Sequence, residues 1–185
     1  MAWSAQYGAV GMVAAILAQK RRGVGTRDRL KTICAYFLHN LIMWDRAYEK
    51  ALMELEMHKV LVVIMGDKNH KDLLRQSAGG LFLELATKRD AIASIIPLLL
   101  EAMVGMCKSG LETLEEPGVR GLAWLAAGPD CKEMLLERGA VEQLAAVVKR
   151  RGDNDTIREF SLRGMLNLST HPKCQVRSRT VLSTS

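Results

Sequence analysis

The sequence has few aromatic residues, few prolines and few cysteines. Phe, Trp and Tyr make up 5% of its 185 residues, and there are only four prolines and four cysteines. Leu, Ala, Met and Val dominate instead, and strong helix formers with few β-branched runs favour helices over sheets. With 49% hydrophobic and 25% charged residues, the chain can bury one sizeable core or one continuous spine of core. The composition predicts an all-α protein and excludes disorder of the whole chain.

Long hydrophobic runs are also missing. Two uncharged, mostly apolar stretches run from Val10 to Ala18 and from Ala91 to Leu100. A helix that crosses the hydrocarbon core of a membrane needs roughly 20 residues. We therefore expect a protein that does not span a membrane.

The four cysteines, Cys34, Cys107, Cys131 and Cys174, lie far apart in the sequence. No pair has the C-x-x-C spacing of a zinc or redox site. His171 and Cys174 are spaced like metal ligands, but the sequence offers no further ligands nearby. We interpret the cysteines as reduced, mostly buried thiols, which points to an intracellular, reducing compartment.

Motifs of catalysis and nucleotide binding are absent as well. There is no H-E-x-x-H, no G-x-x-x-x-G-K-[ST] loop and no G-x-S-x-G elbow. The only G-x-G, Gly23-Val24-Gly25, follows no strand and is interpreted as a loop. The acid pair Glu115-Glu116 precedes Pro117, where acids suit the start of a helix. We predict no catalytic, cofactor-binding or metal-binding residues, no small-molecule substrate, and therefore no enzyme.

The informative feature of the sequence is a repeated five-residue pattern that ends in leucine. Its four copies are Phe37-Leu38-His39-Asn40-Leu41, Leu81-Phe82-Leu83-Glu84-Leu85, Gly121-Leu122-Ala123-Trp124-Leu125 and Gly164-Met165-Leu166-Asn167-Leu168. Successive closing leucines are 44, 40 and 43 residues apart. That spacing lies within the roughly 40 to 47 residues of armadillo and HEAT repeats.

A second element recurs between these copies, as in Gly139-Ala140-Val141 and Ile96-Pro97-Leu98. Together the two elements resemble the armadillo repeat, whose second helix opens with Gly-small-Ile-Pro-x-Leu and whose third ends in Ala-Leu-x-Asn-Leu. The copy from Glu137 to Ser169 fits best, whereas Phe37 and Leu81 stand where the family places a small residue. HEAT repeats remain an alternative for individual copies.

The resemblance implies an all-α, right-handed superhelical α-solenoid of about four armadillo-like repeats. We expect the repeat domain over residues 1–169, with repeats at 1–44, 45–87, 88–127 and 128–169, and a basic tail over 170–185. Each repeat hides its apolar face against its neighbours, so both ends of such an array need caps. Neither end of this sequence carries a clear one.

The pattern also predicts the individual helices. We expect them over residues 8–20, 29–43, 45–57, 58–66, 70–87, 89–94, 95–108, 117–126, 130–138, 139–151 and 154–169. Asp153 and Asp155 are expected to mark the start of the last helix, and Pro97 and Pro117 each fit a first helical turn. Glycine inside a helix costs roughly 1 kcal/mol against alanine, and close approach of another helix is the expected compensation. This applies to Gly79, Gly80, Gly121 and Gly164.

In armadillo proteins the Asn of Ala-Leu-x-Asn-Leu faces a concave groove and holds the backbone of an extended peptide. Carried over by position, the resemblance implies a groove lined by Tyr36, Asn40, Glu84, Arg120, Trp124, Arg163 and Asn167. The Trp that nuclear-import receptors of this family carry one turn earlier is missing, so such a receptor is not expected. Arginines and aromatic residues suit an acidic or aromatic-containing segment. The alternative is that some of these side chains, Trp124 above all, pack between repeats.

Both ends of the chain are basic. Residues 1–27 and 160–185 each hold four Lys or Arg and no acid, while the net charge of the chain is +6. Basic ends suit an acidic protein surface, acidic lipid or nucleic acid, although an ordinary solvated surface is the alternative. The acid-free first 27 residues also have the charge bias of a mitochondrial presequence. We favour the other interpretation, that residues 8–20 form a structural helix. The candidate contact patches are Lys20, Arg21, Arg22, Arg27, Lys173, Arg177 and Arg179.

The sequence thus favours a non-catalytic protein-binding scaffold or adaptor, a structural subunit of a larger multiprotein assembly. Its expected partners are other protein subunits with acidic surfaces or segments, in a cytoplasmic, cytoskeletal, ciliary or mitochondrial setting. The alternative is a nucleic-acid-binding helical-repeat protein, which the shortage of stacking aromatic residues disfavours.

Overall fold

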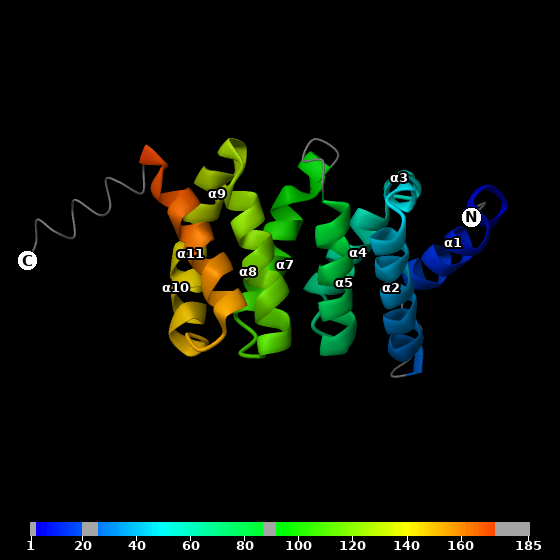
Figure 1. The fold of residues 1–185 in the computed structure, drawn as a ribbon, viewed down its shortest axis with the longest axis horizontal. Coiled ribbons are helices and arrows are strands. Elements are labelled where there is room, and N and C mark those ends of the chain that lie inside the picture. The colour runs from blue at the N-terminus through cyan, green and yellow to red at the C-terminus, as the bar shows by residue number, and fades with distance from the viewer. Residues whose placement is uncertain (1–2, 20–25, 87–91, 173–185) are drawn as a thin grey trace, which may run out of the picture. The chain divides into compact units, whose positions relative to one another are not determined.

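The computed structural model describes residues 3–19, 26–86 and 92–172 (Figure 1). Over these ranges the chain forms ten α-helices, two short 3-10 helices and no strand, which confirms the all-α prediction. The α-helices are α1 Trp3–Ala18, α2 Thr26–Trp44, α3 Ala47–Glu54, α4 Met57–Gly66, α5 Asp72–Leu85, α7 Ile96–Cys107, α8 Glu112–Ala126, α9 Lys132–Glu137, α10 Ala140–Arg150 and α11 Asp155–Ser169. The 3-10 helices are η1 Ala93–Ile95 and η2 Pro129–Cys131.

The chain divides into two compact units, Met1–Ala102 and Met103–Ser185. The boundary falls inside α7, so this helix contributes to both. The repeated leucines 41, 85, 125 and 168 lie at or near the ends of α2, α5, α8 and α11, and these four helices are called the third helices below. The first unit contains two third helices and so does the second.

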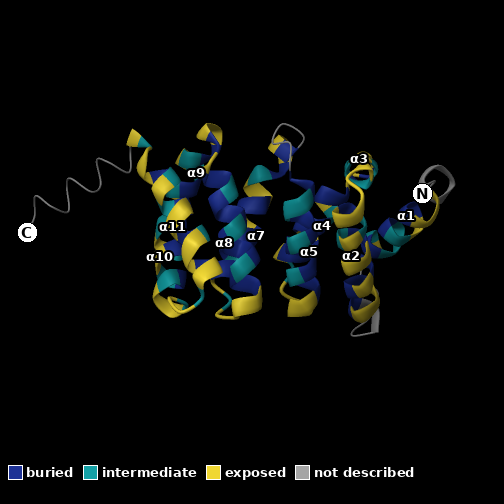
Figure 2. Cartoon of the chain, viewed as in Figure 1, coloured by how far each residue is buried: buried dark blue, intermediate teal, exposed yellow. Residues whose placement is uncertain are grey.

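In the first unit α5 packs against both α2 and α4, and α1 packs against α2 and α4. The apolar residues of α4 recur every four positions, as Met57, Leu61 and Met65, and all three are fully buried. Leu74 and Leu81 of α5 are buried as well. The core of this unit therefore lies between α2, α4 and α5, whose inner faces are dark in Figure 2.

In the second unit α11 packs against both α8 and α10. Leu125, Leu144 and Leu168 are almost completely buried in the core that these helices share. The last helix begins where the sequence predicts, but its cap is Asn154, whose side-chain oxygen accepts a 3.0 Å hydrogen bond from the Ile157 amide. Neither Asp153 nor Asp155 fills that role.

The structure corrects the expected start of α8. This helix begins at Glu112, so Pro117 lies well inside it and not in its first turn. A proline there removes only the hydrogen bond to the carbonyl of Thr113, which is exposed and belongs to the first turn. Pro97, by contrast, is the second residue of α7, in the first turn as expected.

The interior glycines of the third helices fall into two groups. A Cβ atom on Gly121 would overlap the sulfur of Met103, and one on Gly164 would lie 2.9 Å from Leu144 and 3.3 Å from the Cα of Ala123. Close packing, as predicted, therefore explains both. Gly80 differs, because nothing lies within 4 Å of the place its Cβ would take. Gly79 is buried.

No helix in the described part of the chain is long and apolar enough to cross a membrane. The repeat boundaries expected from the sequence stay a prediction.

Candidate functional site

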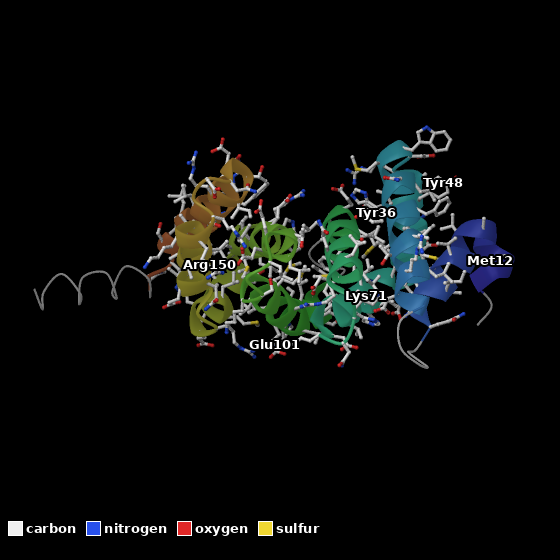
Figure 3. All side chains as sticks on the ribbon, turned by 90° about the horizontal axis from the view of Figure 1, so that it is seen from below. Met12, Tyr36, Tyr48, Lys71, Glu101 and Arg150 are labelled. Carbon is white, nitrogen blue, oxygen red and sulfur yellow. The ribbon has the colours of Figure 1, made fainter. Side chains whose placement is uncertain are left out.

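The residues implied by the resemblance lie on all four third helices. In the first unit Tyr36 and Asn40 of α2 are exposed and Glu84 of α5 is half-buried. In the second unit, Arg120 and Trp124 belong to α8, whereas Arg163 and Asn167 belong to α11. All four are at least partly exposed. Tyr36 can be located on its helix in Figure 3.

In the second unit two of the predicted arginines converge on one aromatic ring. The guanidinium carbon of Arg120 lies 5.4 Å from the centroid of Phe160, and that of Arg163 lies 5.7 Å from it. Both distances are within the range of a cation–π interaction. The ring therefore holds a pair of positive charges, one from α8 and one from α11, and we call these three residues the arginine cluster.

The ion pairs of the arginine cluster leave it available to a ligand. Arg120 lies 3.8 Å from Glu116, and Arg163 lies 3.1 Å from Glu159, each one turn earlier on its own helix. The arginine side chains are 38% and 59% exposed. Exposed pairs of this kind contribute only about 0 to 1 kcal/mol, so a ligand carboxylate can displace them.

Close packing of α8 and α11 brings the two arginines together. Gly164 of α11 faces Ala123 of α8, and a Cβ at position 164 would lie 3.3 Å from the Cα of Ala123, closer than most side chains approach a neighbour. The Asn154 side-chain amide also donates a 2.7 Å hydrogen bond to Glu112, which ties the first turns of the two helices to one another. The spacing of the cluster is thus set by the interior of the unit.

A buried carboxylate further fixes α8. Glu115 is completely buried, and its Oε1 accepts hydrogen bonds of 3.0 and 2.7 Å from Arg150. Its Oε2 accepts a 2.9 Å hydrogen bond from Arg151. The same arginines donate to the carbonyls of Cys107 and Gly110. Figure 3 labels Arg150, which sits on α10.

Sequence reasoning missed this contact, because it interpreted Glu115 only as an acid at the start of a helix. The partners lie 35 and 36 residues apart, a little less than one repeat. That spacing is the one signal that could have linked them. The carboxylate stabilises the unit and is not a ligand site.

The first unit has no matching cluster of cations at the predicted positions. Glu84 instead accepts a 3.0 Å hydrogen bond from Arg46, and Gly80 stands where α8 has Arg120. A buried polar contact of this unit lies at the other end of the third helices. There Asp28 bonds the His70 ring at 3.1 Å and the Lys71 amide at 3.0 Å, which links α2 to the start of α5.

Burial shifts the pKa of two described thiols and of one described histidine. Burial, followed by the charge of Glu115, raises the pKa of Cys107 to about 12, and burial also raises the pKa of Cys34. Burial lowers the pKa of His58, whose Nδ1 atom has no hydrogen-bond partner. Within the described ranges no three metal-binding side chains come together.

The predicted basic contact patches cannot be placed. Lys20, Arg21, Arg22, Lys173, Arg177 and Arg179 lie outside the described residues, and so does the side chain of Arg27. They stay predictions from the sequence.

Two solved structures are similar to this chain in fold, both of them crystal structures of engineered proteins from the Northeast Structural Genomics Consortium. The first has a TM-score of 0.71 and 18% identity and covers 88% of this chain and 63% of its own. The second has a TM-score of 0.71 and 17% identity and covers 89% of this chain and 65% of its own. The match thus spans less than two thirds of either engineered protein, and at this identity it concerns the fold alone. No protein-family model and no curated protein sequence matches the chain.

Proposed function

We propose that the protein is a non-catalytic scaffold of armadillo-like repeats, arranged as an α-solenoid, that binds an acidic extended segment of a partner protein. The arginine cluster on α8 and α11 carries this proposal. The closing leucines, 40 to 44 residues apart, support the repeat architecture. A subunit role in a larger assembly, cytoskeletal, ciliary or mitochondrial, fits a chain whose arginine cluster suits an acidic segment of another protein.

The chemistry of the arginine cluster favours carboxylates. A guanidinium group presents N–H donors in a planar fork that matches a carboxylate, and two such groups here share one ring. Stacking on Phe160 preorganises both side chains, so less conformational entropy is lost when a ligand binds. The cluster therefore fits a segment with two acidic side chains better than one with a single charge.

The next turn of the same helices supplies groups for the backbone of that segment. Asn167, one turn after Arg163, is half-buried and its amide can both donate and accept. Trp124 holds the matching place one turn after Arg120 and is also half-buried. The arginine cluster would select the acidic side chains of the peptide, and the next turn would bind its backbone. Together they would recognise an extended acidic peptide.

The test is a titration of the full chain with a fluorescent peptide of alternating Glu and Ser. We expect binding that weakens with salt, and a loss of at least about tenfold, or 1.4 kcal/mol, in Arg120→Ala and Arg163→Ala. Arg158→Ala is a matched control, because this arginine also lies on α11 and pairs only with local groups. Circular dichroism should show unchanged helix content for each variant.

Two results would contradict the proposal. One is equal binding of the Glu peptide and its Lys counterpart. The other is tighter binding of single-stranded RNA than of the Glu peptide, with the same dependence on Arg120 and Arg163, which would favour the nucleic-acid alternative.

A further inference from the structure

One face of α2 exposes large apolar side chains along almost its whole length. Leu30 is 48% exposed, Ile33 59%, Phe37 46% and Trp44 82%. Their spacing of three, four and seven residues places all four on one side of the helix. We call these residues the α2 face; exposed positions along this helix are yellow in Figure 2.

Helix α5 buries the same positions. Leu74, Ser77 and Leu81 of α5 lie 44 residues after Leu30, Ile33 and Phe37, and all three are buried in a helix that packs on α2. In α11 the position that matches Phe37 is Gly164, which contacts Ala123 of the preceding third helix. The α2 face therefore corresponds to the side of a third helix that packs against the preceding third helix.

The opposite side of that interface is exposed on α11. Val119 and Ala123 of α8 are buried, and Ala123 contacts α11. The residues 43 positions later are Leu162, 51% exposed, and Leu166, 67% exposed. These two leucines, one turn apart, form the α11 face. The chain thus carries both halves of a helix–helix interface, each uncovered in the described structure.

An acidic residue near the start of each third helix follows the same repeat. The Asp28 carboxylate bonds His70 and Lys71 at the start of the following third helix, and Glu112 bonds Asn154 in the corresponding manner. The matching acid of α11 is Asp155, whose side chain is 85% exposed. By repeat spacing, the matching stretch of a second copy would be the part of the sequence just before Asp28, which holds cations and no acid.

We infer that the α2 face binds the α11 face of a second copy of this chain. This contact is heterologous, so it builds chains or closed rings of copies. It uses neither Arg120 nor Arg163, so it stands or falls separately from the peptide site.

Sedimentation velocity of the full chain over about 1 to 100 µM tests the inference. We expect the wild type to form species larger than a dimer as concentration rises. Phe37→Glu, which damages only the α2 face, and Leu166→Glu, which damages only the α11 face, should each be monomeric. An equimolar mixture of the two variants keeps one intact copy of each face and should give a 1:1 dimer and nothing larger.

Val63→Glu is the control, since Val63 is 58% exposed on α4 and belongs to neither face; it should associate like the wild type. A wild type that stays monomeric at about 100 µM overturns the inference. So does a mixture of the two variants that fails to associate, or a dimer that survives in Leu166→Glu alone, which would indicate α2 paired with α2.

Discussion

The two units of the chain bury similar residues at repeat-equivalent positions but expose different ones. Leu85 of the first unit and Leu125 of the second are both buried. On the solvent side of the same helices, however, Gly80 in the first unit is replaced by Arg120 in the second. Interior positions are held by packing, whereas exposed positions are free to acquire a binding role. At the repeat-equivalent positions, the second unit therefore carries a pair of arginines that the first unit lacks.

The buried polar contacts of the two units differ in the same direction. In the first unit Asp28 is met by a histidine and a backbone amide, whereas in the second unit Glu115 is met by two arginines. Loss of one charged partner from a buried pair is costly, because its hydrogen bonds are lost and the site is left unfilled. We expect the second unit to be the more sensitive to such a change.

The largest effect is expected from Glu115→Ala. This change removes three hydrogen bonds of a fully buried side chain and leaves a cavity, so it should lower the free energy of unfolding by about 3 kcal/mol. Chemical denaturation monitored by circular dichroism measures this. Asp28→Ala in the first unit should cost less, about 2 kcal/mol. A larger loss for Asp28→Ala would reverse the comparison.

A second contrast is between Gly118 of the second unit, which is tightly packed, and Gly80 of the first unit, which has no neighbour near its Cβ position. A Cβ on Gly118 would lie 2.8 Å from the Cys107 sulfur and 3.1 Å from both the Cys107 nitrogen and the Met103 carbonyl oxygen. Because two of these atoms belong to the backbone, they cannot move aside cheaply. Gly118→Ala should therefore destabilise the protein by about 2 kcal/mol, measured as a shift of the urea midpoint. An unchanged midpoint would show that α7 and α8 are less tightly packed than described.

In the first unit His58 makes stability depend on pH. Burial lowers its pKa below the ordinary 6.5, so the unfolded chain binds more protons than the folded one as the pH falls through that value. The free energy of unfolding should thus decrease as the pH is lowered from 7.5 to 5. His58→Leu should weaken this dependence and stabilise the protein by about 1 kcal/mol at pH 6, because it removes a buried nitrogen without a partner. Parallel pH profiles for the two proteins would contradict this account.

The smallest effect is expected at Gly80, the counterpart of Arg120. Its Cβ would meet no neighbour, and alanine is the better helix former. Gly80→Ala should raise the free energy of unfolding by about 0.5 kcal/mol, whereas the same change at Gly118 lowers it. Thermal denaturation of both variants gives the comparison, and destabilisation by Gly80→Ala would show that this position is packed after all.

The sequence predicts interior features of the fold well, because they depend on local periodicity. The closing leucines and the packing role of Gly121 and Gly164 could all be read from spacing. The partners of Glu115 could not, since they lie a repeat away and local sequence indicates only a solvated helix start. Phe160 was missed for a related reason. It looks like a core residue of α11, and only the placement of α8 beside α11 shows two arginines over its ring.

The most direct test is to follow amide chemical shifts while the protein is titrated with the Glu-Ser peptide. The shifts show which of the two units binds the peptide. The account predicts that shifts gather on α8 and α11 around Arg120, Phe160 and Arg163, while α2 and α5 change little. Shifts centred on Tyr36, Asn40 and Gly80, or spread evenly over both units, would contradict it.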